Sequence, residues 1–90
     1  MIMFTEVKET NGFFTLNSRA INPETILDVQ PNLFLKRKLK EGKLVEGLNP
    51  NHEFSSLTIQ KGLTMEQVCV VGSVESINEK VVKKKQLLLG

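Results

Sequence analysis

The sequence has no Trp, no Tyr, a single His and a single Cys among its 90 residues. One cysteine excludes a disulfide within the chain and a zinc site made of several cysteines. It is compatible with a reducing compartment. The sequence contains five Phe. With no Trp or Tyr beside them, a binding surface rich in large aromatic side chains is not expected.

Long apolar runs are absent as well. No segment approaches the ~18 apolar residues that a membrane-spanning helix needs. The start of the chain, MIMFTEVKE, lacks the basic region and the apolar run of a signal peptide. We therefore expect a soluble, cytoplasmic protein. The length predicts a single small domain over residues 1–90, with a modest core that association between copies would extend.

Alternating and apolar segments predict a chain built mainly of strands. The Asn11-Gly12 pair is the strongest hairpin signal, because both residues tolerate positive φ. Turn residues predict loops over 17–24 and 49–52. Lys40 to Lys43 predict a turn between the strands over 33–39 and 44–48. Up to seven short strands follow from these breaks: 2–7, 13–16, 25–29, 33–39, 44–48, 54–60 and 65–71.

The clearest local pattern lies between Thr64 and Lys85. The run Val68-Cys69-Val70-Val71 predicts a central strand that is covered on both faces. Gly72 ends the strand, and Ser73 is a good N-cap for a helix over 74–85, followed by a frayed tail over 86–90. The predicted fold is therefore mainly β: a small antiparallel sheet or partly open barrel with one C-terminal helix.

Residues that carry chemistry are scarce. His52 stands in a turn-rich loop without a second nitrogen ligand, so we interpret it as a solvated loop residue. Cys69 lies among valines, which favours a buried, inert thiol. Glu75 and Glu79 stand four residues apart on the predicted helix, where their charges repel mildly, so we interpret them as solvated rather than catalytic. The sequence predicts no enzyme, no cofactor and no metal site.

The basic residues are unevenly distributed. Of twelve Lys and Arg, five fall between Lys36 and Lys43, and four more fall between Lys80 and Lys85. Such clusters indicate a surface that binds the phosphate backbone of a nucleic acid, with Phe34 available to stack on a base. The alternative is a solvated edge that prevents strands of different copies from pairing. The candidate contacts are Lys36, Arg37, Lys38, Lys40, Lys43, Lys83, Lys84 and Lys85.

Four short motifs follow one another along the chain: Asn11-Gly12, Phe14-Thr15-Leu16-Asn17, Leu57-Thr58-Ile59-Gln60-Lys61-Gly62 and Val70-Val71-Gly72-Ser73-Val74-Glu75-Ser76-Ile77. Their order resembles that of the small flagellar and swarming motility proteins of the FlbD type. The stretch from Leu33 to His52 has no counterpart in that pattern. The resemblance implies a small, β-rich, non-catalytic protein that self-associates or binds a partner. An accessory protein of a phage or mobile element fits the same outline.

Two functional expectations follow. The first is a non-catalytic interaction or assembly module that forms homo-oligomers or binds a protein partner, without a membrane or small-molecule ligand. The second is a nucleic-acid-binding protein that uses the basic hairpin and the lysine-rich end of the helix.

Overall fold

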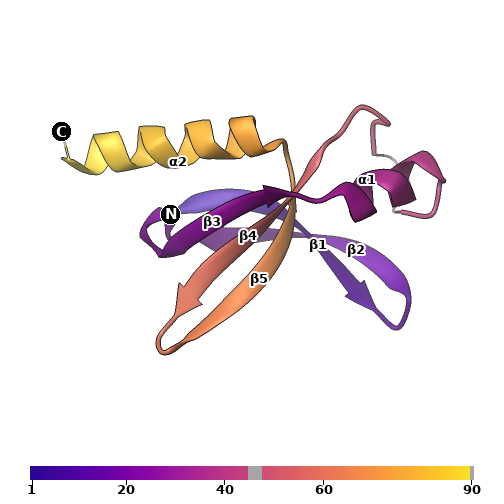
Figure 1. Ribbon diagram of the computed structural model, residues 1–90, viewed down its shortest axis with the longest axis horizontal. Helices are drawn as coiled ribbons and strands as arrows, with labels where there is room; N and C mark the ends of the chain where they lie inside the picture. The colour runs from indigo at the N-terminus through magenta and orange to yellow at the C-terminus, as the bar shows by residue number, and fades with distance from the viewer. Residues whose placement is uncertain (45–47, 90) are drawn as a thin grey trace.

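The computed structural model describes the backbone of residues 1–44 and 48–89, with side chains as far as Lys83. Its core is one antiparallel sheet of five strands with two helices (Figure 1). The mainly β fold with a C-terminal helix is therefore confirmed. The elements are β1 (Ile2–Thr10), β2 (Phe13–Ile21), a 3-10 turn (Pro23–Thr25), β3 (Ile26–Pro31), α1 (Leu33–Lys40), β4 (Phe54–Lys61), β5 (Thr64–Val71) and α2 (Val74–Leu89).

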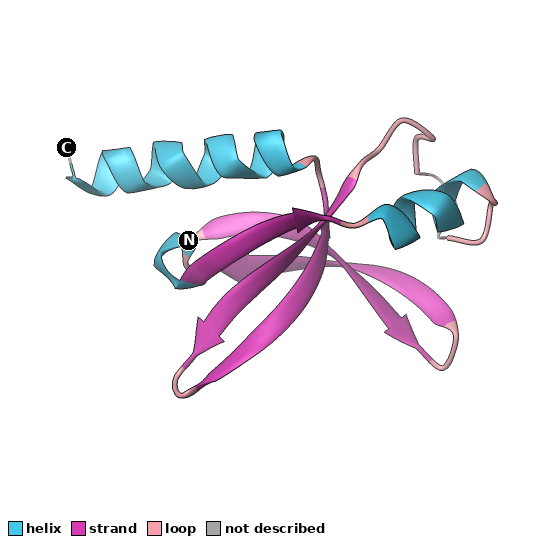
Figure 2. Cartoon of the chain, in the orientation of Figure 1, coloured by secondary structure: helices cyan, strands magenta, loops and turns pink. Residues whose placement is uncertain are grey.

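The strand order across the sheet is β2-β1-β5-β4-β3, so β2 and β3 form the two edges. β1 and β2 pair along their whole length, and so do β4 and β5. Between these two hairpins the ladder is reduced to Glu6 opposite Val70. The hairpins therefore cross and then diverge, as Figure 2 shows, and the sheet is open rather than closed into a barrel.

The predicted Asn-Gly hairpin is confirmed. Asn11 and Gly12 adopt φ values of 52° and 83°, the conformation of a two-residue hairpin turn that matches the twist of the strands. Thr10 and Phe13 lie directly opposite each other on either side of this turn. The register of the whole β1–β2 hairpin is thus fixed by its turn.

Helix α2 covers one face of the sheet. Its N-terminus is capped by Ser73, whose Oγ accepts a hydrogen bond from Ser76 N at 3.1 Å. Ile77 and Val81, one turn apart, are buried in the main apolar core and form the apolar stripe of the helix. The other buried members come from the strands: Ile2, Phe4, Ile21, Leu57, Ile59, Val68 and Val70.

The prediction of a strand over 33–39 was wrong, because these residues form helix α1. Asn32 caps the helix by accepting a hydrogen bond from Leu35 N through its side chain at 3.0 Å. Leu35 and Leu39, one turn apart, face a second apolar cluster with Val7 and Phe54. In a strand these leucines would also share a face, so the spacing fits both structures.

Other boundaries also differ from the expectations. β2 continues to Ile21, so the predicted loop over 17–24 begins later than expected. The predicted strand over 44–48 lies partly outside the described residues, and Leu44 and Leu48 are not in a strand. Without a strand on either side of Lys40 to Lys43, there is no basic hairpin among the described residues. Helix α2 runs to Leu89 rather than 85.

Candidate functional site

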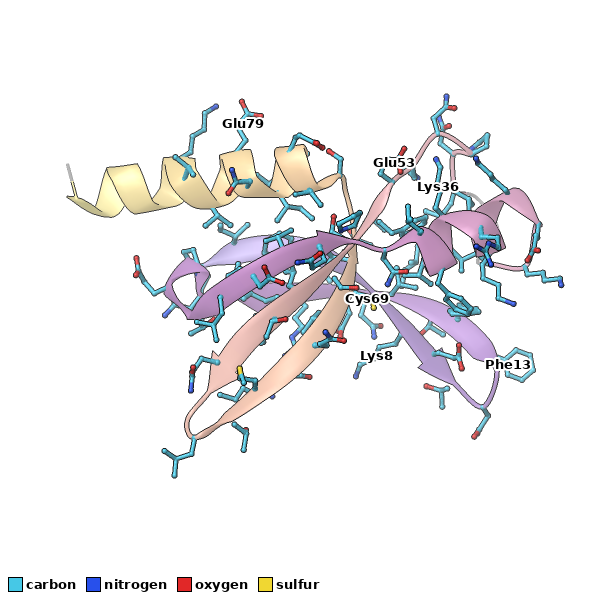
Figure 3. The ribbon with its side chains drawn as sticks, viewed as in Figure 1. Lys8, Phe13, Lys36, Glu53, Cys69 and Glu79 are labelled. Carbon is cyan, nitrogen blue, oxygen red and sulfur yellow. The ribbon has the colours of Figure 1, made fainter. Side chains whose placement is uncertain are left out.

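The basic residues predicted from 36–43 gather on and after α1. Lys36 is held by the following loop rather than presented to solvent. Its Nζ donates to the carbonyl oxygens of His52 at 2.8 Å and Pro50 at 3.2 Å, and lies 3.6 Å from the Glu53 carboxylate (Figure 3). Lys36 therefore fastens the loop to the helix, which is a structural role.

The outer face of α1 carries the remaining cations of the helix beside exposed apolar side chains. Arg37 and Lys40 are exposed, and the Lys38 ammonium lies 5.3 Å from the centre of the Phe34 ring. The helix contains no acidic residue. We refer to this region as the α1 surface, formed by Leu33, Phe34, Arg37, Lys38 and Lys40.

The second basic cluster does not join the first. Lys83 is exposed on α2, and the side chains of Lys84 and Lys85 lie outside the described part. Figure 1 shows the C-terminal half of α2 and the whole of α1 at opposite ends of the molecule. Lys43, just after α1, lies 3.9 Å from the Glu41 carboxylate. The eight candidate contacts are therefore divided between two distant regions.

His52 and Cys69 differ in burial from what the sequence predicted. His52 is half-buried rather than solvated, and its Nδ1 is enclosed without a hydrogen-bond partner among the described residues. Cys69 is half-buried, and its Sγ accepts a hydrogen bond from Asn32 Nδ2 at 3.4 Å. Between described residues, neither side chain forms a hydrogen bond with an acidic or basic side chain. Among the described residues, no three His, Cys, Asp or Glu side chains converge as metal ligands.

A groove of about 510 Å³ opens beside the start of α2, between the helix and the loop that leads into β4. Its lining includes the exposed carboxylate residues Glu53 and Glu75, together with Pro31, Phe54, Ser73 and Val74. The acidic residues disfavour an anionic ligand at the helix N-terminus, where the Ser73 hydroxyl already serves as a cap.

The outer edge of β2 is a feature that the sequence analysis missed. In a two-residue hairpin the residues that close the turn are hydrogen-bonded to each other. Thr10 and Phe13 close this turn, so odd-numbered residues of β2 bond to β1 and even-numbered residues direct their N–H and C=O groups outward. We refer to these outward groups as the β2 edge: Phe14, Leu16, Ser18 and Ala20.

The β2 edge is unpaired within the described part of the chain. β2 has one strand partner there, β1, and no hydrogen bond to an outward backbone group occurs between described residues. The strand spans nine residues without Pro or Lys. Long, regular edges with few charges are the ones that recruit another strand. The Asn-Gly turn could have revealed this edge, because it fixes which residues face outward.

The opposite edge, β3, carries features that discourage pairing. It has six residues, ends at Pro31 and contains a register irregularity between Ile26 and Asp28. Proline lacks a donor, and a bulge interrupts the regular row of backbone groups. The charged Asp28 is exposed and accepts a hydrogen bond from Gln30 at 3.1 Å. The sheet therefore has one protected edge and one open edge.

Comparisons of the chain with family models, with curated proteins and with solved structures give no match. The resemblance to the FlbD-type motility proteins thus stays a prediction. No helix in the described part is long and apolar enough to cross a membrane.

Proposed function

We propose that this protein is a small, non-catalytic assembly module that associates with itself. The observation that supports the proposal best is the asymmetry of the sheet, in which β3 is protected and β2 is left open over nine residues. An open edge supplies a row of backbone donors and acceptors that a second strand satisfies. The single cysteine, Cys69, suits a reducing compartment such as the cytoplasm.

Exposed apolar side chains support the same proposal. Phe13 at the tip of the β1–β2 hairpin is 74% exposed and projects away from the sheet (Figure 3). Burial of such a ring in an interface removes a large apolar area from water. A domain of this size also gains core by association, because a short chain buries a smaller fraction of its surface.

Sedimentation velocity over a range from about 1 to 500 μM tests self-association, a range that spans micromolar and weaker dissociation constants. We expect the weight-average sedimentation coefficient to rise with concentration toward that of an oligomer. A single monomeric species across the whole range contradicts the proposal.

A second candidate function rests on the α1 surface. Its cations are not balanced by acidic residues within the helix, and the Phe34 side chain is 55% exposed next to them. Cations that neutralise phosphates, combined with an aromatic ring that stacks on a base, are the elements of single-stranded nucleic-acid binding. This candidate relies on Arg37, Lys38 and Lys40, with Lys43 nearby, and does without Lys36.

Fluorescence anisotropy with a short labelled single-stranded oligonucleotide tests this candidate. The double variant Arg37→Ala/Lys40→Ala is expected to weaken binding and to reduce its salt dependence. Lys83→Ala, at the other end of the molecule, is the matched control and should bind like the wild type. A flat titration of the wild type at low salt contradicts the candidate.

A further inference from the structure

We propose that a second copy of this chain pairs with the β2 edge in antiparallel orientation, about a two-fold axis that passes beside Asn17. This inference rests on the proposed self-association and specifies its interface. The two sheets then join through neighbouring β2 strands into one continuous sheet, and both open edges disappear at once.

The register follows from the outward groups of β2. If Asn17 faces Asn17 of the second copy, Leu16 faces Ser18 and Phe14 faces Ala20 across the interface. Each residue of the β2 edge thus pairs with another residue of the β2 edge. A shift of one pair along the strand moves one end of the pairing out of β2. The centred register therefore forms the most backbone hydrogen bonds.

Side chains of complementary size meet in this register. Residues opposite each other in an antiparallel pair point to the same face of the sheet. The large Phe14 and Leu16 side chains, which pack beneath α1, then lie beside the small Ala20 and Ser18 of the second copy. On the other face the exposed Phe13 lies opposite Ile21 of the second copy, whose side chain is buried in its own core.

The charges also permit a second copy. Arg19 is the only charged residue of β2 and faces the neutral Thr15 in this register. Its guanidinium is already paired with Glu6 at 3.1 Å and Glu66 at 2.8 Å in its own chain. Two-fold pairing therefore brings no like charges opposite each other within β2. Such like-charge pairs are what commonly disfavours pairing between identical strands.

Cysteine cross-linking tests both the partner and the register. The background is Cys69→Ser, which removes the only native thiol and keeps an oxygen acceptor near Asn32. In the proposed register the Asn17 pair is not hydrogen-bonded, with Cα atoms about 4.5 Å apart, which suits a disulfide. Asn17→Cys should therefore form a disulfide-linked dimer in high yield under mild oxidation.

Thr15→Cys is the matched control on the same exposed face of the strand. It stands four residues along the strand from its own copy, about 13 Å away, which is beyond the reach of a disulfide. It should stay largely uncross-linked under the same conditions. The inference is overturned if both variants cross-link equally. It is also overturned if Asn17→Cys forms no disulfide in a sample that is dimeric.

The variant Ser18→Pro provides a second, independent test of the β2 interface. The Ser18 N–H points outward, so proline there removes a donor to the second copy and none to β1. We expect the dimer dissociation constant to rise at least tenfold while the circular dichroism spectrum and the melting curve of the monomer stay near those of the wild type. A wild-type dimer that Ser18→Pro leaves intact overturns the β2 interface but not self-association. A wild-type chain that never dimerises overturns both.

Discussion

Arg19 joins the two hairpins of the sheet through its guanidinium. It binds Glu6 across the β1–β2 hairpin and Glu66 on β5, and Lys61 lies 3.1 Å from the same Glu66 carboxylate. The strand ladder between the hairpins is a single residue pair, so this ion chain reinforces a sparse part of the sheet. The hydrogen bond from Arg19, followed by that from Lys61, lowers the pKa of Glu66 to about 2.

This low pKa gives Glu66 a testable pH dependence. The folded pKa lies below the ordinary value of 4.5, so the stabilisation is complete above that value and is lost as the pH falls toward 2. Glu66→Gln should cost about 1 kcal/mol or less at pH 7, since the carboxylate is partly exposed and solvent screens it. Urea denaturation at pH 7 and at pH 2.5 checks the prediction. We expect the difference in unfolding free energy between variant and wild type to shrink at pH 2.5; an unchanged difference contradicts the role of the ion chain.

The packed core predicts a sharp contrast between two leucines on or next to β4. Leu57 is fully buried between the sheet and α2, whereas Leu63 in the β4–β5 turn is fully exposed. Leu57→Ala should destabilise the fold by about 2–5 kcal/mol through lost burial and the cavity left behind. Leu63→Ala should change the stability by less than about 0.5 kcal/mol. Chemical denaturation of both variants measures the contrast, and similar losses would contradict this description of the core.

At the scale of elements, helix α1 is anchored by one side chain at its start. The Asn32 side-chain oxygen accepts from Leu35 N, and its Nδ2 donates to Ser56 Oγ at 3.0 Å and to Cys69 Sγ at 3.4 Å. Asn32 therefore caps α1 and also ties it to β4 and β5. A short helix of this kind depends on such tertiary contacts, because eight residues do not form a stable helix alone.

Substitution of Asn32 separates these two roles. Asn32→Ala loses the cap and both donated bonds and should cost about 1–3 kcal/mol. Asn32→Asp keeps the acceptor for Leu35 N and loses only the donated bonds, so it should be less destabilising at pH 7. Thermal melts followed by circular dichroism rank the variants. Equal losses would indicate that the cap contributes little.

The sequence predicted the β1–β2 hairpin and the start of α2 because their signals are local. Asn11-Gly12 and the Ser73 cap act within a few residues of the structure they determine. Helix α1 was missed because Leu35 and Leu39 suit both a strand and a helix, and the cap at Asn32 decides between the two. The role of Lys36 was also hidden, since its partners lie 14 and 16 residues away. Which strand is open depends on the strand order, and local pattern does not determine that order.

At the scale of the whole molecule, the two helices and the two edge strands determine which surfaces of the sheet are covered and which are open. α2 covers one face of the sheet (Figure 2). Leu35 and Leu39 of α1 pack in the apolar cluster on the other face. β3 ends at a proline and contains a register irregularity, and both disfavour pairing with another strand. The β2 edge is left available within the described part of the chain.

Residue-resolved amide hydrogen exchange of the wild-type chain, at about 5 μM and at about 500 μM, tests the central claim most directly, because only bonded amides are protected. Amides of Thr15, Asn17 and Arg19 bond to β1, so they should exchange slowly at both concentrations. Amides of Leu16, Ser18 and Ala20 should exchange rapidly in the dilute sample and become protected in the concentrated one. Rapid exchange of these three amides at both concentrations, in a sample that sediments as an oligomer, would contradict assembly through the β2 edge.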